Sequence, residues 1–513
     1  MHQRPTTGAY PKRLARSERG VTLILTLLTL GLMLLLGLAL TMSSMSGVIV
    51  SGSYERDTRS FYIAEAGINH ALSIFRGING DPNNTGTLTG DLNGDGRFDF
   101  SDVLYGSSAS QGQLLIDSHY IPSTYTIIPS GGLTIGSGIN GGTYTVRVFD
   151  DDNPVVNFAS PGLPPNEGNA GTADPLVDHN NRLIVRSIGT AATGARTVID
   201  AEIGFIVFPA LLTQGSISLS GNSTISGQYG SVHTNTNLSL SGSTSIAQSA
   251  TASGTISQSG SPSVGGFESG NQPVIPIPDL NPFPAAGDVL PQNFFISKAD
   301  LVMVKNLTDL TDAWTKLGYP VASLPASVPA SGYAIRTSDQ TLQTPSTYGW
   351  SLSGTTWSPS GAAAGNNQAY FAYGDMDING GTYTMTVVAT GHYHVNGNAA
   401  FTPYWAGSRA IALPGIQPPF AKIDLLFLAG TDFWMNGNAS ESITYNGVIY
   451  AGEQVKLLGN ATFYGQVLAK DRSSSDSYIT ADDVQGNFTL NFNNSTGVLG
   501  SITLIAWRQV KQF

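Results

Sequence analysis

Residues 16–40 read RSERGVTLILTLLTLGLMLLLGLAL, and this stretch decides how the chain begins. Five basic residues and one acid precede Gly20, whereas residues 21–40 contain no charge and no proline. At ~1.5 Å rise per residue, a helix of that length spans ~30 Å, the hydrocarbon thickness of a bilayer. Because basic residues stay on the cytoplasmic side, the sequence predicts a single-pass anchor with a cytoplasmic N-terminus and an exported body.

An ordinary signal peptide fits this pattern poorly, because its apolar region is shorter and ends at a small-residue cleavage site. A basic leader closed by glycine and followed by a full-length apolar helix resembles a type IV prepilin. In that family a peptidase cuts after the glycine and the new N-terminus is methylated. The resemblance therefore implies that residues 1–20 are a prepilin leader, cut between Gly20 and Val21.

Two further features narrow the resemblance to PilX-type minor pilins. The fifth mature position holds Leu25, where major pilins carry a glutamate, and residues 61–67 read FYIAEAG, one helix length beyond the membrane run. The similarity covers residues 1–76, with a weaker match at Ala506-Trp507-Arg508. It implies a minor pilin or pilus-assembly protein.

Residues 21–77 are predicted to form one long helix. No proline occurs from Val21 to Arg76, and Gly77 is a C-cap candidate. Beyond the membrane run, apolar residues recur at helical spacing while polar residues fall elsewhere on the wheel. The serine- and glycine-rich residues 41–52 are expected to kink or melt. The predicted apolar stripe consists of Phe61, Ala64, Ile68, Ala71, Leu72 and Phe75.

Composition limits the chemistry of the exported body. The net charge is −11, and loss of the leader would take it to about −15, so nucleic acid is not an expected partner. The chain has no cysteine, which excludes disulfides and thiol chemistry.

Residues 91–102, DLNGDGRFDFSD, match the twelve-residue calcium loop of EF-hand and dockerin type. Such a loop needs oxygen ligands at positions 1, 3, 5, 9 and 12, glycine at 6 and a backbone carbonyl at 7. The alternative is a surface turn rich in Asp, Asn and Gly. We expect one calcium ion as cofactor, held by Asp91, Asn93, Asp95, the Arg97 carbonyl, Asp99 and Asp102.

The rest of the chain indicates an α+β fold, with an α/β pilin-like head in residues 78–207 that includes the calcium loop. Residues 142–148, 182–187 and 197–206 are expected strands of this head. Residues 208–279 and 371–513 are expected to be two parts of a β-solenoid, and residues 280–370 an α/β insert with a short helix near Trp314.

The solenoid prediction rests on a repeated sequence pattern. ISLSGN at residue 217 recurs as LSLSGS at 238, and similar segments occur at residues 395–399, 435–439 and 457–461. A period near twenty with Gly-Asn turns is typical of a solenoid, and an antiparallel β-domain is the alternative.

No catalytic motif is present, and residues 217–265 contain no Asp, Glu, Lys or Arg, so we expect no enzymatic activity. His392 and His394 lie at i and i+2 without an obvious third metal ligand.

The sequence therefore predicts a minor, tip-located type IV pilus subunit for pilus assembly, surface adhesion or both. Two alternatives stay open: a membrane-anchored carbohydrate-binding or carbohydrate-active β-solenoid, and a minor pseudopilin of type II secretion. The expected location is the bacterial inner membrane, followed by the pilus or cell surface. The expected partners are other pilins, the inner membrane, prepilin peptidase, and a surface glycan or a host or abiotic surface.

Overall fold

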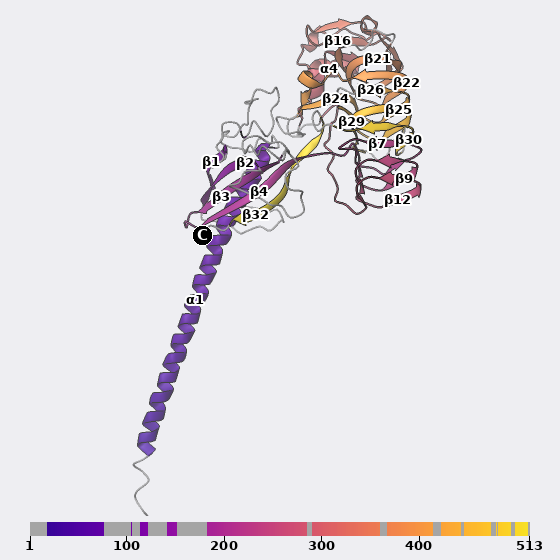
Figure 1. The fold of residues 1–513 in the computed structure, drawn as a ribbon. Coiled ribbons are helices and arrows are strands. Elements are labelled where there is room, and N and C mark those ends of the chain that lie inside the picture. Colours follow the sequence, from indigo (N-terminus) through magenta and orange to yellow (C-terminus); the bar gives the residue numbers. More distant parts are fainter. Residues whose placement is uncertain are drawn as a thin grey trace, which may run out of the picture.

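The computed structural model describes residues 18–75, 104, 113–121, 141–150, 182–284, 290–359, 367–413, 422–442, 446–472, 479, 481–493 and 498–510. A long N-terminal helix precedes a mainly β body, so the fold class is α+β, as predicted. In Figure 1 the helix projects from one end of a sheet, and a larger stack of short strands lies beyond the other end of that sheet.

Helix α1 (Glu18–Phe75) is continuous through residues 41–52, so the expected interruption there is wrong. Serine and glycine lower helix propensity by no more than about 1 kcal/mol per residue, and this segment holds no proline that would remove a hydrogen bond of the helix.

The C-terminal part of α1 packs on a five-stranded antiparallel sheet of strand order β1-β2-β3-β4-β32. Phe61 of the expected stripe is only partly buried, whereas its other members are at most 6% exposed: Ala64, Ile68, Ala71, Leu72 and Phe75. The predicted strands at residues 142–148, 182–187 and 197–206 are confirmed within this sheet. The strands are β1 (Gln113–Ile121), β2 (Gly142–Asp150), β3 (Arg182–Ala191), β4 (Arg196–Val207) and β32 (Gly500–Val510).

Glycines let the helix and the sheet approach each other closely. A Cβ on Gly67 would lie 2.2 Å from Ser187 Oγ, and a Cβ on Gly189 would lie 2.4 Å from the Ala64 backbone nitrogen. The AEAG motif of residues 64–67 thus forms part of the contact between helix and sheet. Ser60, a polar residue outside the predicted stripe, is also buried, and its hydroxyl lies 2.6 Å from Thr197 Oγ1.

Strand β32 corrects the expected domain boundary at residues 371–513. It pairs with β4, where Gly500 lies opposite Val207, so the end of the chain completes the five-stranded sheet. The whole stack of short strands is therefore inserted between two adjacent strands of that sheet. The chain leaves the sheet at Phe208 and returns to it at Leu499, and buried Gln466 links these two crossings. Its Nε2 donates to the carbonyls of Phe208 and Leu499, and its Oε1 accepts from the Leu499 N–H.

The inserted body consists mainly of short strands in two stretches. The first stretch contains β5 (Leu211–Thr213), β6 (Ile217–Leu219), β7 (Thr224–Ser226), β8 (Val232–Thr234), β9 (Leu238–Gly242), β10 (Ser245–Ile246), β11 (Ala250–Ala252), β12 (Ile256–Gly260), β13 (Ser263–Val264) and β14 (Glu268–Ser269). The second stretch contains β20 (Gln368–Ala372), β21 (Asp375–Ala389), β22 (Tyr393–Thr402), β23 (Ile411–Ala412), β24 (Lys422–Ala429), β25 (Phe433–Gly437), β26 (Ser440–Glu441), β27 (Gly447–Ala451), β28 (Val455–Gly459), β29 (Thr462–Ala469), β30 (Asp482–Gly486) and β31 (Thr489–Asn491).

Three parallel ladders run through both stretches. One passes through β27-β29-β5-β8-β11, the second through β25-β28-β30-β6-β9-β12, and the third through β29-β31-β7-β10-β13. Each coil of chain thus gives one strand, or one part of a long strand such as β29, to each ladder. The last coil of the second stretch stacks directly on the first coil of the first stretch. Alternate residues of each strand point inward and form one apolar core.

The repeats seen in the sequence stack in register. Val395 pairs with Met435, and Met435 pairs with Leu457. The first two repeats are 40 residues apart, about twice the expected period, yet β22 and β25 are direct neighbours, so this spacing is a single coil. One coil is longer because it carries an excursion that includes β23, which pairs back on β24.

Residues 290–359 cover the far end of the stack. The predicted short helix near Trp314 is confirmed as α4 (Leu307–Lys316), which buries Leu310, Ala313 and Trp314. The other elements here are α3 (Phe294–Lys298), β15 (Leu301–Val304), β16 (Tyr333–Arg336), β17 (Thr341–Gln343), β18 (Trp350–Ser353) and β19 (Thr356–Pro359), with short 3₁₀ turns at Val321–Ser323 and Pro345–Tyr348, and another at Gly407–Arg409 in the second stretch. Strand β15 pairs with β20 in parallel, which joins this region to the stack.

A column of glycines forms one corner of the stack. Each has a positive φ, and a Cβ on each would lie within 3 Å of the backbone of the glycine in the preceding coil. For Gly459, with φ +89°, a Cβ would lie 2.5 Å from the Gly437 carbonyl oxygen. The column consists of Gly437, Gly459, Gly486, Gly221, Gly242 and Gly260.

We predict that Gly459→Ala destabilises the body more than Gly354→Ala. Gly354 also has a positive φ, +62°, but no atom lies within 4 Å of where its Cβ would be. Both variants should therefore lose about 1–2 kcal/mol through backbone strain, and Gly459→Ala should lose about 1–3 kcal/mol more through overpacking. Urea denaturation followed by tryptophan fluorescence measures the difference, and equal losses would show that the column does not limit coil spacing.

Candidate functional site: an uncovered apolar helix

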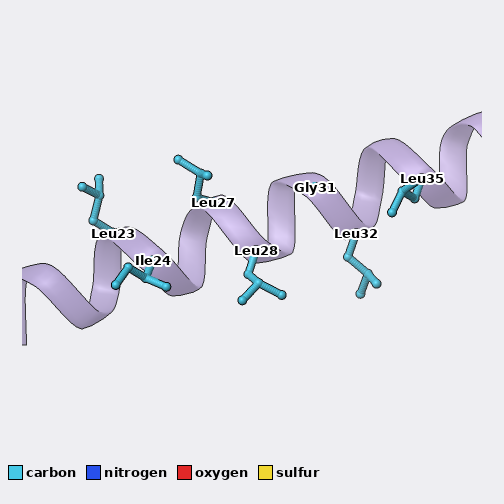
Figure 2. Close-up of a pocket in the computed structure, with 7 residues that line it drawn as sticks. All are labelled: Leu23, Ile24, Leu27, Leu28, Gly31, Leu32 and Leu35. Atoms are coloured by element: carbon cyan, nitrogen blue, oxygen red, sulfur yellow. The ribbon is translucent and has the colours of Figure 1, made fainter.

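The N-terminal half of α1 exposes a continuous apolar surface. From Leu23 to Val50 the large apolar side chains are 55–75% exposed. Because they occupy most positions from residue 23 to 36, they point to all sides of the helix. Figure 2 shows one side, where the missing side chain of Gly31 leaves a shallow apolar hollow beside Leu27, Leu28 and Leu32. Exposure of apolar surface to water costs a free energy of roughly 25 cal/mol per Å², so this helix requires an apolar environment.

Three threonine side chains in this surface are satisfied within the helix. The hydroxyl of Thr26 donates to the Thr22 carbonyl, that of Thr29 to the Leu25 carbonyl and that of Thr41 to the Gly37 carbonyl, at 2.8–3.0 Å. None of these hydroxyls needs water as a partner. The helix is long and apolar enough to span a membrane, and it is the one such helix among the described residues.

The apolar surface is longer than a bilayer is thick. Leu23–Val50 is twenty-eight residues, or ~42 Å at 1.5 Å per residue, against ~30 Å of hydrocarbon. If residues 21–40 lie in lipid, the exposed side chains of Met42, Met45, Val48 and Ile49 still need another apolar partner. The small residues between them, Ser43, Ser44, Ser46 and Gly47, would let a second helix approach closely.

Gly20 and Val21, the expected cleavage pair, lie in the first turn of α1, which begins at Glu18. The calcium-loop residues Asp91, Asn93, Asp95, Arg97, Asp99 and Asp102 lie outside the described residues, so that metal site stays a prediction. Within the described part of the chain, no group of three or more His, Cys, Asp and Glu side chains is arranged to hold a metal ion.

His392 and His394 lie on the outer face of the stack, each beside an aspartate of the neighbouring coil. His392 Nδ1 is 3.1 Å from Asp375 Oδ1, and His394 Nδ1 is 3.5 Å from Asp377 Oδ1. Burial lowers the pKa of His394 below its ordinary value, although Asp377 counteracts this. The histidines therefore lie in two His-Asp pairs across neighbouring coils, although the buried Nε2 of His394 has no hydrogen-bond partner among the described residues.

Trp434 continues this outer column. The His394 ring stacks on it with centroids 4.5 Å apart, and Lys456 Nζ lies 5.8 Å from its centroid on the next coil. Both faces of the indole are thus occupied by protein. A sugar ring could not stack on Trp434 in this arrangement, so the column is a structural ladder.

Two buried carboxylates were not anticipated from the sequence. Glu441 is 5% exposed, and burial raises its pKa well above the ordinary value, with nearby Asp424 raising it further. Asp482 is 2% exposed and occupies an inward position of β30. The burial of Asp482 could have been predicted from the repeat. DDVQGN at residue 482 aligns with VKLLGN at residue 455, which places Asp482 at an apolar position.

Comparison with known proteins adds little to these features. No protein-family model matches the sequence, and no curated protein matches it. A solved structure found by the comparison is the competence-associated pilin ComZ from Thermus thermophilus, at 12% identity and a TM-score of 0.24, covering 89% of this chain and 97% of that one. A similarity of that size carries no functional conclusion, so the function has to be inferred from this chain's own residues.

Proposed function

We propose that this chain is a pilin-like subunit that α1 anchors in the bacterial inner membrane and that the same helix later packs into a filament. The observation that carries the proposal is the apolar surface of α1, which exceeds the bilayer by ~12 Å. A bundle of similar helices would cover both the membrane part and the segment above it. The Gly20-Val21 leader junction and the AEAG motif support the same assignment by resemblance.

The position within the filament follows from Leu25. In the resembling major pilins, an acid at this place pairs with the N-terminal amine of a neighbour inside the apolar filament core. A buried charge left without its partner costs several kcal/mol, so repeating Leu25 in every subunit would be unfavourable. We therefore place the chain at low copy, at or near the filament tip, as a minor pilin of PilX type.

The inserted body supports a display role. It enters and leaves the head at neighbouring points and extends away from α1 (Figure 1). The three parallel ladders support a β-solenoid, which is an extended surface suited to adhesion or to the start of pilus assembly. We propose that calcium at residues 91–102 is a structural cofactor of the head, and that the chain has no enzymatic activity.

The carbohydrate-active alternative has less support, because the outer column at Trp434 offers no free aromatic face. The type II pseudopilin alternative shares the same anchor and differs in its partner subunits.

The first test concerns processing. Mass analysis of the N-terminal peptide from the native membrane should find a chain that starts at Val21 with a methylated amine. The reason is the change from basic leader to apolar helix at Gly20. An intact leader, or a new N-terminus beyond Leu40, would contradict the pilin assignment.

The second test separates the membrane anchor from the filament contact. Ile49→Lys places a charge above the bilayer but inside the proposed helix bundle, so the chain should stay in the membrane fraction. Its amount in sheared filaments should fall by at least about tenfold, because an unpaired buried charge costs several kcal/mol. Ser53→Lys, on an exposed residue past the apolar surface, is the control and should assemble normally. Equal recovery of both variants would remove the bundle contact from the proposal.

The third test locates the subunit. Immunogold labelling of sheared filaments with an antibody to the body should mark the ends, and a deletion strain should have few filaments. Label at regular intervals along the shaft would rule out the tip position.

A further inference from the structure

Asp482 interrupts an apolar column in the core of the body. The inward positions before it are Phe433 and Val455, and those after it are Ile217 and Leu238. All four apolar residues are at most 2% exposed, as is Asp482. A carboxylate in such a place is costly unless a charge or hydrogen bonds compensate it.

The compensation that the described residues supply is incomplete. Asp482 Oδ1 accepts a hydrogen bond from the Val455 N–H at 2.8 Å, but among the described residues Oδ2 has no partner. Neighbouring Gln454 is 7% exposed, and its Nε2 donates to Asp471 Oδ1 at 2.9 Å. Gln454 Oε1 also has no partner within the described part of the chain. Two buried acceptor oxygens at one corner therefore receive no donor from the residues that the structure describes.

Gly215, between β5 and β6, packs closely against this corner. A Cβ built on Gly215 would lie 2.9 Å from Asp471 Oδ2 and 3.2 Å from Asp482 Oδ2, and the next nearest atom is Asp471 Cγ at 3.5 Å. One oxygen of Asp471 and one of Asp482, which lie at the same corner between β29 and β30, thus converge on Gly215 of the next coil. A residue larger than glycine at position 215 would clash with them.

Nearby cations and donors have other partners. Lys470 Nζ donates to the Ile277 carbonyl, and Arg472 pairs with Asp279 and donates to the Gly430 carbonyl. Asp432 adds negative charge close by, while its own oxygens accept from the N–H groups of Gln454 and Ile479.

We propose that Asp471, Asp482 and Gln454 bind one calcium ion beside Gly215. The donors are two carboxylates and one amide oxygen, which is the ligand chemistry of a hard cation, and no nitrogen or sulfur ligand is present among these three side chains. The ion would lie among Gln454 before β28, Asp471 after β29 and Asp482 at the start of β30, next to the β5–β6 corner of the first stretch. It would therefore hold together the junction at which the two stretches stack.

The experiment uses the full chain in detergent micelles with Asp91→Ala and Asp95→Ala, which silence the predicted loop at residues 91–102. Thermal unfolding is followed in EDTA and in millimolar calcium chloride. We expect calcium to raise the unfolding midpoint in this background and to slow amide hydrogen exchange in β5 and β29, because an ion bound only to the folded state stabilises it.

Asp482→Asn should abolish the calcium response, and Asp471→Asn should abolish or strongly reduce it. Asp483→Asn is the matched control, because Asp483 is the next residue but lies on the outer side, opposite Lys456 in the adjacent coil, and it should respond like its parent. In EDTA, Asp482→Asn should be at least as stable as its parent, since it removes a buried charge. No calcium shift in the parent, or a shift that survives in Asp482→Asn, would overturn the proposal; if Asp482→Asn does not fold, Asp471→Asn decides.

Discussion

Close contact between the backbones of successive coils is the constraint on which the body depends. Parallel strands lie about 4.8 Å apart, and the corner formed by Gly437, Gly459 and their equivalents must turn within that spacing with a positive φ. Only glycine satisfies both the turn and the distance to the carbonyl of the preceding coil. The strands on either side then fall into register, and their inward residues meet in one core. The corner thus sets the register that the apolar contacts consolidate.

Local patterns predicted the local elements well. The α1 stripe, the strands of the head sheet, the helix around Trp314 and the recurring Gly-Asn theme all reflect interactions within a few residues or within one repeat. Pairing between distant segments was not visible in this way. Nothing near Gly500 indicates that β32 pairs with β4, since its partner lies almost three hundred residues earlier. The forty-residue spacing between Val395 and Met435 was also ambiguous, because an excursion and an additional coil give the same number.

The two candidate sites, the α1 surface and the corner at Asp482, also differ in how far the sequence alone predicts them. The uncovered surface of α1 follows from composition alone, because a helix that is apolar on every side cannot be covered by one small sheet. The corner at Asp482 depends on residues from four segments, and its neighbours Gly215 and Asp471 have no sequence signature. Aligning residues 482–487 with the other repeats would have exposed the unusual acid, but only the stacked coils show that an oxygen of Asp471 faces the same point.

The side-by-side entry and exit of the body affect how the molecule carries mechanical load. A pull on the far end of the body reaches the head at Val207 and Gly500 together, so β4 and β32 are drawn in the same direction and their mutual hydrogen bonds are not sheared. Gln466 holds the two crossings as a single point of attachment. The tension passes instead to the β3–β4 ladder and to the contact between the sheet and α1, including the tight fit of Gly189 against Ala64. Within the head, the pairing of β4 with β32 is therefore spared, and the fit of α1 on the sheet carries the load.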